Sequence, residues 1–159
     1  MFEKFTKDAR KTVTNAVEEA ELRADTRIGT EHLLLGVCRA GVLDELGVDE
    51  ATARRELRRL DTDALASVGV DAGEFSDGPG AGRRGRQRHI PFTGAGKQAL
   101  VQALVEARTV GSRRIEPEHI ALAISRLPDH DRAIRVLRGA GVNPTELRKA
   151  LVEGLRRVS

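Results

Sequence analysis

Apolar residues recur at spacings of three and four along most of the chain, a pattern typical of helices that bury one face. The first apolar stripe consists of Phe5, Ala9, Val13, Ala16, Val17 and Ala20. After the helix that this stripe predicts, a second helix is expected to start near Thr30 and a closing helix near Asp49. Strand-type alternation of apolar and polar residues is not the prevailing pattern, so we expect an all-α fold.

The chain repeats itself. A shift of 87 residues places Phe5-Thr6 on Phe92-Thr93 and Glu31-His32 on Glu118-His119. After Arg39 the shift becomes 94, because the first copy lacks seven residues at that point. Self-similarity of this extent indicates a duplication. We therefore predict one domain, 1–159, made of repeat 1 (1–60), a linker (61–90) and repeat 2 (91–159).

The second repeat predicts the same helices, with one addition. Its helices are expected near the stripe Leu100 to Ala107, from Pro117, and after Asn143, where a cap residue precedes a first-turn proline. An extra helix is expected over residues 130–138. Its counterpart in repeat 1 is predicted to be short or missing, because only Ala40-Gly41 precede Val42 there.

The segment between the repeats has the composition of a flexible linker. Residues 69–85 carry many Gly, Asp and Ser, and an arginine cluster follows. The arginines lack the interleaved aromatic residues that single-strand binders use, so we interpret them as solvated. A nucleic-acid or regulatory binding protein acting through this cluster is the alternative function. The cluster consists of Arg83, Arg84, Arg86 and Arg88.

Composition narrows the class of protein. The 159 residues contain no Tyr or Trp and four Phe, so Leu, Val, Ile and Ala must form the core. No apolar run approaches the roughly 20 residues that span a bilayer, and no signal peptide is evident. The single cysteine, Cys38, suits a reducing compartment, and we expect a cytoplasmic protein. The net charge of +3 does not by itself indicate nucleic acid.

Candidate catalytic and cofactor motifs are weak. Thr93–Gln98 superficially has the form of a phosphate loop, but Pro91 and Gln98 stand where the motif needs Gly and Ser or Thr, so we expect a helix start. His32 and His119 lack metal-ligand spacing and are expected to be packed or capping residues. An enzyme using His32 and Cys38 is the least favoured alternative. We expect no catalytic residue, metal or cofactor.

Glu31 and Glu118 are the most informative residues. Each lies in the first turn of a predicted helix, where a carboxylate complements the helix dipole. An acid at a helix start is usually only a local stabiliser. The duplication adds a second hypothesis, in which two symmetric helix starts form two equivalent binding notches.

Three segments, Met1–Thr6, Ile28–Gly36 and His89–Thr93, resemble the N-terminal domain of Clp-type AAA+ unfoldases, especially the ClpC branch. The resemblance implies two four-helix repeats related by a pseudo-twofold axis. It also implies a non-catalytic docking module that receives substrates and adaptors for the Clp ATPase and protease.

The resemblance also implies site residues. In the ClpC branch the glutamate of each Gly-Thr-Glu-His motif helps to bind phosphoarginine, which points to Glu31, with Thr30 beside it, and to Glu118. Actinobacterial relatives bind cyclic peptide antibiotics in a pocket between the repeats. The residues that match this pocket are Phe2, His89, Phe92 and Lys97.

The second motif departs from the family pattern. It reads Glu116-Pro117-Glu118-His119, without the threonine that would donate to a phosphate, and Ala121 and Ala123 replace the usual Leu and Gly. No ATPase module or Walker motif occurs before Ser159. We therefore expect a stand-alone paralogue that acts as an accessory factor or a decoy for toxic peptides. A piece of a longer unfoldase is the close variant.

Overall fold

The computed structural model describes residues 2–70 and 89–158, except for the side chain of Phe2. Short 3-10 helices cover Phe2–Lys4 (η1) and Asp44–Leu46 (η2). Repeat 1 otherwise contains α1 (Lys7–Leu22), α2 (Thr30–Arg39) and α3 (Glu50–Ser67). Repeat 2 contains α4 (Gly94–Thr109), α5 (Pro117–Ser125), α6 (Arg132–Gly139) and α7 (Pro144–Val158). No strand longer than an isolated bridge occurs in these ranges, which confirms the all-α fold.

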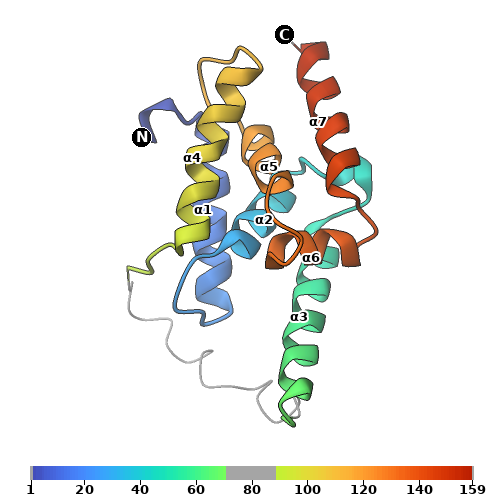
Figure 1. Ribbon diagram of the computed structural model, residues 1–159. Helices are drawn as coiled ribbons and strands as arrows, with labels where there is room; N and C mark the ends of the chain where they lie inside the picture. Colours follow the sequence, from blue (N-terminus) through green and yellow to red (C-terminus); the bar gives the residue numbers. More distant parts are fainter. Residues whose placement is uncertain (1, 71–88, 159) are drawn as a thin grey trace.

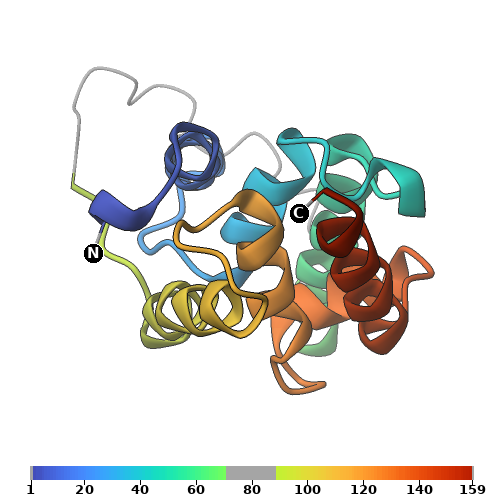
Figure 2. The same cartoon turned by 90° about the horizontal axis from the view of Figure 1, so that it is seen from above.

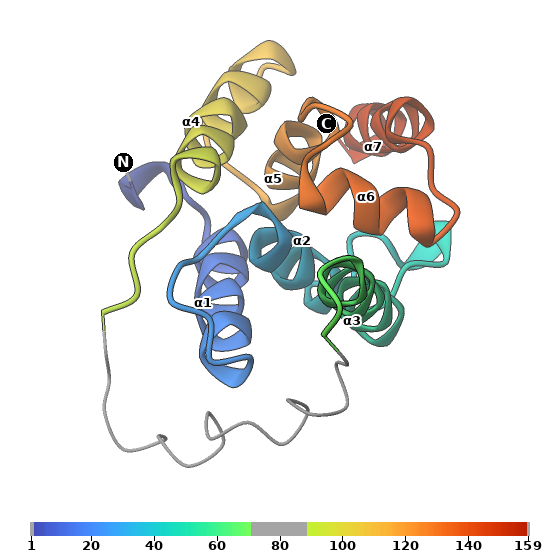
Figure 3. The same ribbon diagram turned by 60° about the horizontal axis from the view of Figure 1, so that its bottom comes forward.

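Helices α2 and α5 lie at the centre of the molecule. The helices α1 and α4 flank them on one side, and α3, α6 and α7 lie on the other (Figures 1 and 3). Helix α3 of repeat 1 packs against α6 of repeat 2, so the repeats interlock. Seen from above, the ends of the chain lie in different repeats, with the C-terminal α7 apart from the N-terminal η1 (Figure 2).

Two isolated backbone bridges join the repeats with reciprocal symmetry. Phe5 pairs with Ile115, and Phe92, the counterpart of Phe5, pairs with Ile28. The Thr6 N–H donates to the Ile115 carbonyl at 3.0 Å, and the Thr93 N–H donates to the Ile28 carbonyl at 2.9 Å. The two bridges are related by the pseudo-twofold symmetry of the repeats. In each bridge, the segment before the first helix of one repeat pairs with the segment before the central helix of the other.

The central helices are buried almost all round. Every residue of α2 from Thr30 to Cys38 is buried except Glu31, and α5 is buried from His119 to Ile124. A helix that is apolar on all sides must lie between others, which explains the central position of this pair.

Gly36 allows α2 to approach α1 closely. A Cβ atom at this position would overlap the Thr12 carbonyl oxygen and lie 3.3 Å from the Ala16 nitrogen. Because the obstacle is backbone, a rotamer change cannot relieve the overlap. The glycine is therefore required by interhelical packing.

The predicted helix starts are confirmed by their caps. The Asp49 side chain accepts a hydrogen bond from the Thr52 N–H at 2.8 Å, and Asn143 accepts from the Thr145 N–H at 2.8 Å. Thr93 accepts from the Gly96 N–H at 2.9 Å, so the apparent phosphate loop is the start of α4.

The region after α2 differs between the repeats, as the missing seven residues predict. Repeat 2 has α6, whereas repeat 1 has only the single 3-10 turn η2. Helix α3 continues to Ser67, which lies inside the span 61–90 that the sequence assigned to the linker. Gly69 follows with a positive φ of 81°. Arg83, Arg84, Arg86 and Arg88 lie outside the described residues.

None of the helices in the described ranges is long and apolar enough to span a membrane.

Candidate functional site

The starts of α2 and α5 are built in the same way around a histidine. The Nδ1 atom of His32 accepts a hydrogen bond from the Gly29 N–H at 2.9 Å, and Nδ1 of His119 accepts from the Glu116 N–H at 2.8 Å. Both imidazoles are buried. This confirms the prediction that the two histidines are packed and capping residues.

The Glu31 carboxylate folds back over the start of α2. Its Oε1 atom lies 3.2 Å from Nδ1 of His32, and the side chain is 14% exposed. A Cβ atom at position 29 would lie 2.9 Å from Cδ of Glu31, so Gly29 leaves the space that this conformation needs. Burial alone raises the pKa of Glu31, but the adjacent His32 and the charge of Arg132 outweigh it and lower that pKa. The group is therefore a carboxylate at neutral pH.

At the start of α2, residues of repeat 2 contact both the Thr30 hydroxyl and the Glu31 carboxylate. The Thr30 hydroxyl donates to Oδ1 of Asp131 at 2.6 Å, and Nε of Arg132 lies 3.8 Å from Oε2 of Glu31. Arg132 also pairs with Asp61 on α3. The carboxylate at position 31 thus already faces a guanidinium, and the hydroxyl of Thr30 already has an acceptor.

The start of α5 presents Glu118 differently. Position 116, the counterpart of Gly29, is a glutamate, and its Oε2 atom accepts from the Thr6 hydroxyl at 3.3 Å. Glu116 and Glu118 line a hollow of about 300 Å³ between α1 and the end of α2. Acidic and basic side chains both line this hollow. The other lining residues are Asp8, Lys11, Thr12, Asn15, Arg39, Ala40, Val42 and Pro117.

The two histidines differ in the partner of Nε2. In His32 this atom donates to Oδ2 of Asp25 at 2.7 Å. The counterpart of Asp25 is Ser112, and Nε2 of His119 has no hydrogen-bond partner within the ranges described. Burial alone lowers the pKa of His32, but Asp25 and Glu31 outweigh it and raise that pKa. Burial lowers the pKa of His119.

Each repeat buries a glutamate under arginines, an arrangement that sequence reasoning missed. Glu19, 1% exposed, accepts from Nε of Arg54 at 3.1 Å. Its counterpart Glu106, also 1% exposed, accepts from Nη2 of Arg148 at 2.7 Å. The arginines neutralise these two buried carboxylates. The repeat alignment was the available signal, since it pairs Glu19 with Glu106 and Arg54 with Arg148.

Cys38 is 4% exposed, and burial raises the pKa of its thiol to about 12. The thiolate, which is the nucleophilic form, is therefore scarce at neutral pH. Residues 2–70 and 89–158 contain no cluster of three His, Cys, Asp or Glu side chains suited to a metal ion.

Three of the four residues expected to form a peptide pocket fall within the short segment 89–97. His89 and Lys97 are exposed, and Phe92 is partly buried against the core. None of these three lines the hollow at Glu118. The side chain of Phe2 lies outside the described residues, so this pocket stays a prediction.

Comparison with known proteins agrees with this architecture. Residues 91–159 match the family described as the Clp repeat (R) N-terminal domain. The chain is 33% identical over 161 residues to a probable ATP-dependent Clp protease ATP-binding subunit of Chlamydia pneumoniae, covering 98% of this chain and 17% of the relative. It is 31% identical over 158 residues to the chloroplastic chaperone protein ClpC1 of Arabidopsis thaliana, covering 96% and 15%. The chain thus spans about a sixth of the length of these relatives.

Solved structures show the same fold. The N-terminal domain of the chaperone ClpD from Arabidopsis thaliana superposes with a TM-score of 0.74 at 24% identity, covering 98% of this chain and 97% of that one. The Hsp104 N-terminal domain from Candida albicans gives a TM-score of 0.64 at 19% identity, covering 94% and 89%.

Proposed function

Since the chain belongs to the family of Clp N-terminal domains, we propose that it is a docking module that binds protein substrates or adaptors of a Clp system. The ligand group that we assign to it is phosphoarginine, a side chain that joins a guanidinium to a phosphate. Glu31 and Glu118 are the proposed recognition residues. The module contributes binding only, and catalysis belongs to its partners.

The observation that carries this proposal is the hollow at Glu118. A phosphoarginine side chain needs carboxylates for its guanidinium and a cation for its phosphate. Glu116 and Glu118 supply the carboxylates, and Lys11 and Arg39 supply cations within the same 300 Å³. Arg39 is shared with Glu18, at 3.0 Å, so Lys11 is the proposed phosphate partner.

The notch at Glu31 has the right chemistry but is already engaged. Its carboxylate lies near Arg132, and Thr30 donates to Asp131. A ligand guanidinium at Glu31 has to displace Arg132, and a phosphate at Thr30 meets the negative charge of Asp131. We therefore expect Glu118 to carry the tighter site and Glu31 the weaker one.

Titration calorimetry with free phosphoarginine tests the proposal. Glu118→Ala removes one carboxylate and one charge-assisted interaction, so we expect about a tenfold loss of affinity. Glu31→Ala is expected to have a smaller effect. Arg132→Ala frees the Glu31 carboxylate and is expected to strengthen binding at that notch.

Glu146→Ala is the matched control, because Glu146 is an exposed first-turn acid of α7 that lines neither hollow. Its affinity should equal that of the wild type. Equal losses in Glu118→Ala and Glu146→Ala would show that binding depends on total charge and not on this site. Wild-type protein that takes up no phosphoarginine would refute this ligand assignment.

A further inference from the structure

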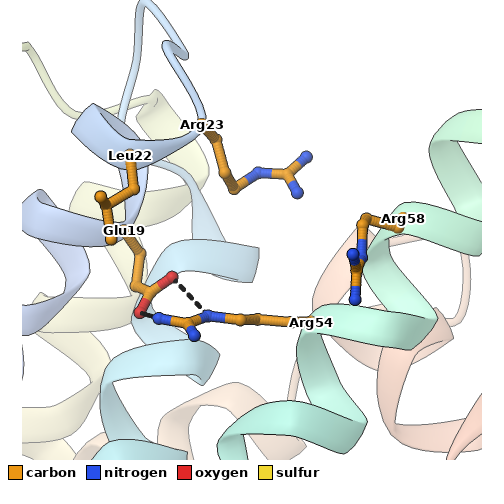
Figure 4. Close-up of a pocket in the computed structure, with 5 residues that line it drawn as sticks. All are labelled: Glu19, Leu22, Arg23, Arg54 and Arg58. Atoms are coloured by element: carbon orange, nitrogen blue, oxygen red, sulfur yellow. Dashed lines mark hydrogen bonds and ion pairs between the residues drawn. The ribbon is translucent and has the colours of Figure 1, made fainter. Parts of the chain in front are cut away.

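A hollow of about 340 Å³ opens between α1 and α3, and three arginines face it. Figure 4 shows Arg23 and Arg58 reaching from opposite sides toward the space beside the Glu19–Arg54 ion pair. Leu22 completes the lining and is 62% exposed. The hollow therefore combines guanidinium groups with one exposed apolar side chain.

Comparison of the two repeats shows which residues that line the hollow are required by the fold and which are not. The Glu19–Arg54 pair has a counterpart in repeat 2, so it belongs to the architecture of the repeat. At the other three lining positions, repeat 2 carries a different type of residue. Leu22, Arg23 and Arg58 correspond to Thr109, Val110 and Val152. Repeat 2 forms the same helices without these two arginines, so their presence in repeat 1 is not dictated by the fold.

The three arginines differ in how far they are neutralised. Arg54 pairs with Glu19 and Glu50. Arg23 pairs with Asp25 and Asp61.

Arg58 is exposed and has no ion-pair partner among the residues that the structure describes. A guanidinium held at the edge of a hollow, with its donors unused by the surrounding protein, is suited to bind a carboxylate from a ligand.

We propose that this hollow docks an acidic segment of a protein partner. A carboxylate of the segment pairs with Arg58, and a neighbouring apolar side chain contacts Leu22. A protein segment fits better than a nucleic acid, because the lining contains no aromatic side chain for base stacking. This site is independent of the phosphoarginine assignment.

The experiment measures fluorescence anisotropy of a labelled peptide of repeated Glu-Glu-Leu units, at low salt, with the full chain. Arg58→Glu replaces attraction by repulsion, so we expect affinity to fall at least about tenfold. Arg55→Glu is the matched control. It makes the same charge change on an exposed residue of the same helix, outside the hollow. Its affinity is expected to change less than about threefold, the size of a surface charge effect.

A second control separates this site from the one at Glu118. Glu118→Ala should leave peptide affinity unchanged, and Arg58→Glu should leave phosphoarginine affinity unchanged. Replacing every Glu of the peptide by Gln should abolish binding.

Three results would each overturn the proposal. The first is a wild-type chain that does not bind the peptide. The second is equal losses in Arg58→Glu and Arg55→Glu. The third is a labelled single-stranded oligonucleotide that binds more tightly than the peptide and depends on Arg58 in the same way.

Discussion

Replacement of Gly36 by Ala tests the closest helix contact in the fold. The added Cβ would overlap the Thr12 carbonyl oxygen and lie 3.4 Å from the Thr12 carbonyl carbon. Helices α1 and α2 pack along their length, so the contact is relieved only by moving one helix away from the other.

The expected cost follows from two opposing terms. Overpacking a rigid core contact costs about 3 kcal/mol, near the top of the usual range because the obstacle is backbone. Alanine has a higher helix propensity than glycine, which returns about 1 kcal/mol. We therefore expect Gly36→Ala to lower the free energy of unfolding by about 2 kcal/mol and the melting temperature by about 6 °C.

Urea unfolding followed by circular dichroism measures this change. The matched control is Gly154→Ala on α7, where an added Cβ meets nothing within 4 Å. That variant keeps only the propensity gain and should be more stable than the wild type by about 1 kcal/mol. A Gly36→Ala protein as stable as Gly154→Ala would refute the close approach of α1 and α2 described above.

Three further predictions concern buried polar groups. Ser112→Asp should give Nε2 of His119 an acceptor and raise the free energy of unfolding by about 1 kcal/mol, measured in urea. Because the folded pKa of His119 is lowered, the wild type should lose stability as pH falls below the unfolded value of about 6.5, and this loss should shrink in the variant. Glu106→Gln should leave the Arg148 guanidinium without its carboxylate and cost about 2 kcal/mol. The pKa of Glu106 is lowered by its hydrogen bonds with arginines despite burial, so it adds to the loss of stability as pH falls below about 4.5, and this loss should be smaller in Glu106→Gln; an unchanged acid transition would contradict the assignment. Cys38 should not react with a disulfide reagent in the native protein, since its pKa is about 12, and should react fully in guanidinium; native labelling at the unfolded rate would contradict its burial.

Local pattern was sufficient to predict the helices and their starts. The apolar period of α1, the cap at Asp49 and the Asn143-Pro144 start depend on residues within one or two turns of each other, so they are legible in the sequence. The repeat alignment also predicted that the third helix of repeat 1 is short, since seven missing residues are two helical turns.

The candidate sites required the tertiary structure. The sequence singled out Glu31 and Glu118 as equivalent, but Arg132 reaches only Glu31, and the glutamate at position 116 changes the surroundings of Glu118. Arg132 is 101 residues from Glu31, and no local pattern connects the two.

Long-range charge pairing was also invisible to local pattern. Arg54 looks like any other arginine on the polar face of α3, yet it covers the buried Glu19, which lies 35 residues earlier. Arg58, one turn further along the same helix, has no such partner in the described ranges and faces a hollow. Helix periodicity determines which face of α3 is apolar. Whether an arginine on the other face is neutralised depends on which helix lies opposite, and that is decided only when the chain folds.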